Sequence, residues 1–116
     1  MTSHDVDGIV IVSPAGPLHE GIECDRLEGA LQALLLQGVR HVVVNLAEAG
    51  HLSARAVGVL ARAHADAELR GLRVAISNPR PDHRQMFDIT GLAAVLDLRP
   101  SDTAAIAALA GRDVAA

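Results

Sequence analysis

The sequence predicts a single α/β domain over residues 1–116, with a mixed but mostly parallel sheet of four to five strands and about four helices. Short β-branched runs alternate along the chain with longer segments in which apolar residues recur every three to four positions. This order of strand and helix, repeated four times, is typical of a mostly parallel sheet. At 116 residues, half of them hydrophobic, the chain suits one core and not two.

The N-terminal residues predict a hairpin and a first core strand. Met1–Asp7 is expected to form a short edge strand, and Asp7-Gly8 is a hairpin turn signal. The β-branched run Ile9–Val12 predicts a buried strand. Ser13–Pro17 contains two prolines and a glycine, so we expect it to form neither helix nor continuing sheet.

The first long helix is expected over Glu20–Gln37, with Gly38 as its stop. Acidic residues suit its first turns because they face the positive end of the helix dipole. The predicted buried stripe consists of Cys24, Leu27, Leu31 and Leu34, widened by Leu35 and Leu36. Val39–Leu46 follows as the second core strand.

A second long helix is expected over Ala54–Arg70, between Ser53 as its N-cap and Gly71 as its end. One face carries Val57, Leu60, His64 and Ala67, which makes His64 a partly buried structural residue. The other face carries Arg55, Arg62, Asp66 and Arg70. That face is either a recognition stripe or a solvated surface with the ion pairs Arg62–Asp66 and Asp66–Arg70.

The last third of the chain repeats the alternation. Leu72–Ser77 predicts a third strand, and Pro81–Ile89 a short helix that buries Met86, Phe87 and Ile89 and stops at Gly91. Ala94–Leu98 predicts a final strand, and Ser101 caps a last helix over Asp102–Ala110, beyond which the tail is expected to fray. The core is expected to include Ile11, Val43, Leu60, Ile76 and Phe87.

Composition excludes several classes of function. Phe87 is the only Phe, Tyr or Trp residue, so a stacking platform for bases or sugars is almost excluded. A net charge of −4 argues against nucleic acid as the partner. The single Cys24 fits a reducing compartment. No signal peptide is visible, and no apolar run approaches the roughly 20 residues that span a bilayer. We therefore expect a cytoplasmic protein without direct membrane insertion.

The chain offers little for catalysis or for metal and cofactor binding. Its six histidines are scattered without metal-ligand spacing, and no glycine-rich phosphate loop is present. Ser53 and His51 are close in sequence, but Ser53 lacks the glycine-flanked elbow of a hydrolase. Its role as an N-cap explains it without catalysis. We therefore expect no enzyme, no cofactor and no metal, with an esterase-like use of Ser53 and His51 as the weakest alternative.

The stretch from Asn45 to Leu60 resembles the STAS family, the domain of anti-sigma factor antagonists and of sulfate transporter tails. Family members read roughly Asn/Asp-Leu, five or six residues, then Asp-Ser-Ser/Thr-Gly-Leu-Gly-Val-Leu. Here Asn45-Leu46 matches the strand end and Val57-Gly58-Val59-Leu60 the helix start. Gly16-Pro17-Leu18 stands where the family has Gly-x-Leu, and Phe87–Leu92 is similar to its segment that ends in Gly-Leu.

The chain departs from the family pattern where that pattern carries its phosphorylation switch. The family aspartate is Ser53, the acceptor serine is Ala54, the following Ser/Thr is Arg55, and the glycine is Ala56. Alanine has no hydroxyl, so no phosphorylation is expected at Ala54. Ser53 is a weak candidate, because it is one residue out of register and its hydroxyl is expected to cap the helix.

The resemblance implies a protein-interaction module. Family antagonists bind a serine-kinase anti-sigma factor while unphosphorylated and so release a sigma factor, and phosphorylation cancels that binding. The expected partner surface comprises His51, Leu52, Ser53, Ala54 and Arg55, with Gly16 and Leu18 beside it. The alternative is an accessory STAS subunit of a transporter, of the lipid-transport type, or of a larger signalling assembly. A homodimer is compatible with either.

Overall fold

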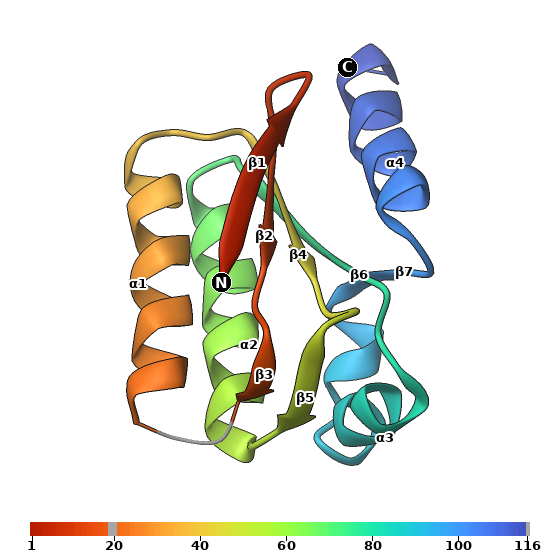
Figure 1. Ribbon diagram of the computed structural model, residues 1–116. Helices are drawn as coiled ribbons and strands as arrows, with labels where there is room; N and C mark the ends of the chain where they lie inside the picture. The colour runs from red at the N-terminus through yellow and green to blue at the C-terminus, as the bar shows by residue number, and fades with distance from the viewer. Residues whose placement is uncertain (19–20, 116) are drawn as a thin grey trace.

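The protein is built on a five-stranded mixed sheet with strand order β1-β2-β4-β6-β7 (Figure 1). This computed structural model describes residues 1–18 and 21–115, and side-chain environments as far as Leu109. The strands are β1 (Thr2–Val6), β2 (Ile9–Ser13), β4 (His41–Asn45), β6 (Arg73–Ser77) and β7 (Asp97–Arg99). β1 pairs antiparallel with β2, and the other three pairings are parallel. The predicted mixed, mostly parallel sheet is therefore confirmed.

The helices form layers on both faces of this sheet (Figure 1). α1 (Ile22–Leu36) and α2 (Ala54–Leu69) lie side by side over one face, and α4 (Asp102–Ala115) covers the other. α3 (Pro81–Ile89) and the 3-10 turn η1 (Leu92–Ala94) lie beyond the carboxyl end of β6. Together these are the four α-helices of the described residues, as expected.

A second, two-stranded sheet is absent from the sequence prediction. β3 (Gly16–Leu18) pairs parallel with β5 (Ala49–Leu52), with Gly16 opposite Ala49 and Leu18 opposite Leu52. The prediction that Ser13–Pro17 forms no sheet was therefore wrong. Pro17 is compatible with this pairing because β3 is an edge strand that pairs with β5 on one side only. The N–H that proline lacks is not required on the other, unpaired side.

Two apolar layers hold the helices to the sheet. The larger joins α1 and α2 to alternate residues of β2, β4 and β6, such as Val12, Val44 and Ile76. The smaller joins α4 to the opposite face, where Ala105 and Leu109 pack on Ile11, Val43 and Ala75. The five residues expected in the core are confirmed as buried, each at most 1% exposed: Ile11, Val43, Leu60, Ile76 and Phe87.

The predictions fail at some helix faces. Leu36 and Ile89, predicted to be buried, are 71% and 73% exposed. Each helical residue turns about 100° from the last, so Ile89 faces roughly away from Phe87, and Leu36 leaves the stripe that ends at Leu35. Met86 and Leu34 are partly buried at the margins of the core.

The limits of several elements also differ from the prediction. Residues Leu92–Ala94 form the 3-10 turn, so the last strand is Asp97–Arg99 rather than Ala94–Leu98. α4 continues to Ala115 instead of fraying after Ala110. α1 begins at Ile22, and Glu20, where the helix was expected to start, lies outside the described residues.

Candidate functional site

Ser53 caps helix α2, as the sequence predicts. Its backbone is extended, with φ −75° and ψ 167°, and its Oγ accepts a hydrogen bond of 3.1 Å from the N–H of Ala56. Ala54 is therefore the first helical residue, and its side chain is exposed. A group attached at this position would face the positive end of the helix dipole.

The small sheet brings the separate parts of the predicted surface together. The N–H of Ser53 donates to the carbonyl oxygen of Leu18 at 2.9 Å, and the N–H of Gly16 donates to that of Glu48 at 3.0 Å. Through these bonds and the β3–β5 pairing, residues 16–18 lie beside residues 49–53. The sequence predicted this proximity, although not the sheet that produces it.

The predicted surface residues differ in their exposure to solvent. His51 and Ala54 are exposed, whereas Ser53 and Gly16 are partly exposed. Leu18 and Leu52 are only 3% and 1% exposed, so their side chains anchor β3 and β5 in the core and do not face a partner. The accessible part of the predicted surface is therefore narrower than the residue set named from the sequence.

Arg55 links the first turns of the two parallel helices. Its guanidinium donates to the carboxylate of Asp25 and, at 3.3 Å, to the carbonyl oxygen of Gly21. The hydrogen bond to Asp25 raises the pKa of the Arg55 guanidinium. The side chain is 35% exposed, so it contributes positive charge to the surface beside Ala54.

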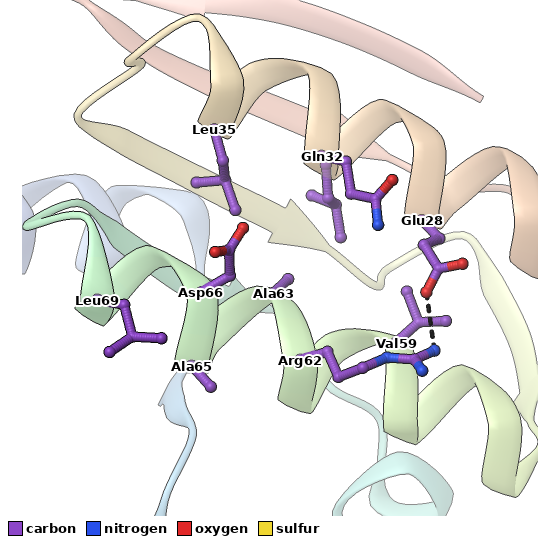
Figure 2. A pocket seen from close by; sticks show the side chains of 10 residues that line it. Glu28, Gln32, Leu35, Val59, Arg62, Ala63, Ala65, Asp66 and Leu69 are labelled. Atoms are coloured by element: carbon purple, nitrogen blue, oxygen red, sulfur yellow. Dashed lines mark hydrogen bonds and ion pairs between the residues drawn. The ribbon is translucent and has the colours of Figure 1, made fainter.

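A groove of about 450 Å³ runs between α1 and α2 (Figure 2). Leu31, Leu35, Val59 and Ala63 provide its apolar lining. Arg62 donates across it to Glu28 at 2.7 Å, so the predicted Arg62–Asp66 pair is replaced by a contact between helices. The predicted Asp66–Arg70 pair is present at 3.0 Å. The Arg face of α2 thus serves at least partly to join helices.

His83 lies at the junction of α3 and β5, where the sequence indicated nothing. It is 1% exposed, its Nδ1 accepts a hydrogen bond of 3.1 Å from the N–H of Arg80, and its Nε2 is 2.7 Å from the carbonyl oxygen of Gly50. At the start of the same helix, the guanidinium of Arg80 binds the carboxylate of Asp82 at 2.9 Å. That contact lowers the pKa of Asp82 to about 2.

Gly50 is required where β5 meets β3. A Cβ atom on Gly50 would lie 3.0 Å from the backbone N and Cα of Pro17, which is tighter than nine in ten Cβ contacts and would require the Pro17 backbone to shift. The absence of a side chain therefore lets the two strands approach.

A polar cluster closes the carboxyl ends of the main strands. The carboxylate of Asp102, at the start of α4, accepts bonds from Asn45 Nδ2 at 3.0 and 3.1 Å and from Ser77 Oγ. Asn45 Oδ1 also accepts from the N–H of Ala47 at 2.8 Å and so shapes the turn after β4. These contacts fix α4 against the sheet, which is a structural role.

The described residues contain no group of three or more His, Cys, Asp or Glu side chains placed to hold a metal ion. Likewise, none of their helices has the length and apolar character needed to cross a membrane.

Comparisons with known proteins agree with this architecture. The model of the STAS domain matches residues 2–110. A search among curated proteins finds no match. Among solved structures, one from Thermotoga maritima has a TM-score of 0.85 at 17% identity and covers 93% of this chain and 92% of its own.

Two further solved structures illustrate different settings of the same fold. The Bacillus protein SpoIIAA, an anti-sigma factor antagonist known in phosphorylated and unphosphorylated forms, has a TM-score of 0.70 at 18% identity in its phosphorylated form, covering 89% of this chain and 94% of its own. A sulfate transporter family protein from Wolinella succinogenes has a TM-score of 0.76 at 19% identity, covering 90% and 86%. At these identities the likeness shows the fold.

Proposed function

The chain belongs to the STAS domain family, and we propose that it is a non-enzymatic protein-interaction module of the anti-sigma factor antagonist type. Its partner on this proposal is an anti-sigma factor of the serine-kinase type in the cytoplasm. Binding of that partner withdraws it from a sigma factor. The family match over residues 2–110 supports this class of function.

The observation that carries the proposal is the exposed start of α2. Ala54 is the first helical residue and is exposed, with the N-cap Ser53 on one side and the partly exposed guanidinium of Arg55 on the other. The β3–β5 sheet leads directly into this turn, and its buried residues Leu18 and Leu52 anchor that sheet in the core. An exposed turn that is fixed by a cap and by buried neighbours is suited to recognition by another protein.

The same residues make the module one that is not switched by phosphorylation. The position at which the family carries its acceptor serine is Ala54, whose methyl group accepts no phosphate. The neighbouring Ser53 hydroxyl accepts a hydrogen bond from the N–H of Ala56, which holds it toward the helix backbone, and Ser53 is one residue out of register with the family's acceptor serine. We therefore propose that the module stays competent for binding while ATP is present.

A matched pair of variants tests the location of the interface. Ala54→Glu adds a charge to the first turn of α2, where an acidic residue suits the helix dipole and should leave the fold intact. Ala107→Glu makes the same change at an exposed position of α4, on the opposite face of the sheet. Binding to a serine-kinase anti-sigma factor from the same organism is measured by calorimetry for both.

We expect Ala54→Glu to weaken binding at least tenfold and Ala107→Glu to leave it within twofold, because a buried uncompensated charge at an interface is costly. Equal effects of the two variants would place the interface elsewhere. No binding of the wild-type chain to any such kinase would contradict the proposed class of partner.

A transporter accessory subunit is the second candidate, favoured by the likeness to the Wolinella succinogenes sulfate transporter family protein. Affinity purification from the native host separates the two. Recovery of a soluble kinase-like ATPase supports the antagonist, whereas recovery of transporter components supports the subunit.

A further inference from the structure

The small sheet that carries the proposed interface is hydrogen-bonded separately from the main sheet. β3 and β5 pair with each other and form a sheet of two strands. An isolated two-stranded sheet is marginally stable, so its position depends on contacts with neighbouring elements. Buried Leu18 and Leu52 supply apolar contacts, and His83 supplies a hydrogen bond from α3 to Gly50 in β5.

The hydrogen bonds of His83 require one neutral tautomer of its imidazole. Nδ1 accepts from the N–H of Arg80, so it carries no proton. Nε2 lies 2.7 Å from the carbonyl oxygen of Gly50, which can only accept a hydrogen bond. Nε2 therefore carries the proton and donates a hydrogen bond to that oxygen. The ring thus joins the start of α3 to the middle of β5, and each nitrogen has a different task.

We propose that His83 is a positioning residue for the partner surface. Through Gly50 it fixes β5, and through β5 it sets where His51, Ser53 and Ala54 stand relative to α3. The inference rests on the proposed function for its partner, but the position of β5 is a property of the free protein. The two can therefore be tested separately.

Two substitutions distinguish the hydrogen bonds from the space that the ring fills. A glutamine side chain has one acceptor and one donor at its tip, so His83→Gln can keep both bonds. His83→Leu is apolar and leaves the Arg80 N–H and the Gly50 carbonyl without their buried partner. Leu109→Ala, in the separate core layer under α4, serves as a control for general destabilisation.

Native-state hydrogen exchange of the Ser53 amide, which donates to Leu18, reports the position of β5 in the free protein. In His83→Leu we expect this amide to exchange about tenfold faster than in the wild type relative to amides of β4, as loss of the buried hydrogen bond to Gly50 in β5 implies. His83→Gln should restore the wild-type ratio. Leu109→Ala should leave the ratio unchanged, even where it accelerates global exchange.

The proposal would be overturned if the exchange rate of the Ser53 amide relative to β4 amides were unchanged in His83→Leu. It would also be overturned if His83→Gln did not show the wild-type ratio of these rates. Should His83→Leu not fold, nitrogen–proton correlation spectra of the wild-type imidazole decide the matter. Protonated Nε2 with bare Nδ1 is required, and the other tautomer would overturn the proposal.

Binding to the serine-kinase anti-sigma factor then tests the link to the interface. His83→Leu should weaken it more than Leu109→Ala does, and His83→Gln should retain it. Equal weakening by His83→Leu and Leu109→Ala would contradict the positioning role. A wild-type chain that binds no kinase would instead contradict the proposed function, while the exchange result still stands.

Discussion

The guanidinium of Arg55 and the carboxylate of Asp25 form an ion pair between the first turns of two parallel helices, 30 residues apart in the chain. The pair places the positive charge of Arg55 beside Ala54 and directs it toward α1. Arg55→Glu would therefore disturb the fold as well as any interface, because a second carboxylate would face Asp25. For this reason the proposed interface is better probed at Ala54.

The Arg55–Asp25 pair should show a measurable coupling in a double-mutant cycle. Arg55→Ala, Asp25→Ala and the double variant are compared by urea denaturation. We expect a favourable coupling that shrinks when salt is raised, because both side chains are accessible to solvent. A coupling of zero at low salt would contradict the pairing.

Removal of the Ser53 cap should destabilise the protein. Ser53→Ala leaves the N–H of Ala56 without its acceptor, and we expect the free energy of unfolding to fall by about 1 kcal/mol. Ser53→Asp, which carries the family residue, should be neutral or stabilising because a carboxylate caps the helix and favours its dipole. An unchanged urea midpoint in Ser53→Ala would show that the cap contributes nothing.

Replacement of Gly50 should be costly, in contrast to a glycine within a helix. A methyl group at Gly50 meets the backbone of Pro17, so we expect Gly50→Ala to lower stability by about 1–3 kcal/mol. In the control Gly29→Ala, within α1, the added Cβ meets no atom within 4 Å. That variant should gain about 0.5–1 kcal/mol from helix propensity. Similar effects at both sites would refute the close approach of β3 and β5.

Acid should remove the stabilisation that the Arg80–Asp82 ion pair gives to the folded state. The pKa of Asp82 in the folded protein is about 2, below its ordinary 3.8, because of the hydrogen bond from Arg80. The pair therefore stabilises the folded state fully above pH 3.8, and this stabilisation is lost as the pH falls toward 2. Asp82→Asn should flatten the dependence of unfolding free energy on pH in this window. Identical pH profiles for wild type and Asp82→Asn would contradict the assignment.

Local signals explain what the sequence could predict. The cap at Ser53 depends on residues within one helical turn. The burial of Val12, Val44 and Ile76 on one face of the sheet follows from strand geometry, in which successive side chains point to opposite faces. The exposure of Ile89 could also have been predicted from the sequence. Ile89 follows Phe87 by two residues, which is more than half a turn of the helix, so the two side chains face opposite sides.

The missed features depend on contacts between distant residues. β3 contains only three residues, one of them a proline, so its pairing with β5 leaves no strand pattern in the sequence. The bond from Arg80 to His83 uses histidine where a capping box normally has Glu or Gln, and Gly50 is 33 residues from His83. Arg55 likewise finds Asp25 only once α1 and α2 pack together.

On the proposed function, this module binds its partner without a phosphorylation switch at the start of α2. Intact-mass spectrometry after incubation with a serine-kinase anti-sigma factor and ATP tests it most directly, with Ala54→Ser as the matched variant. That variant places a hydroxyl at the first helical residue, where the dipole favours a phosphate and Arg55 can pair with it.

We predict that the wild-type chain keeps its mass and stays bound to the kinase, while Ala54→Ser gains one phosphate and dissociates. A stoichiometric phosphate on wild-type Ser53 would contradict the claim.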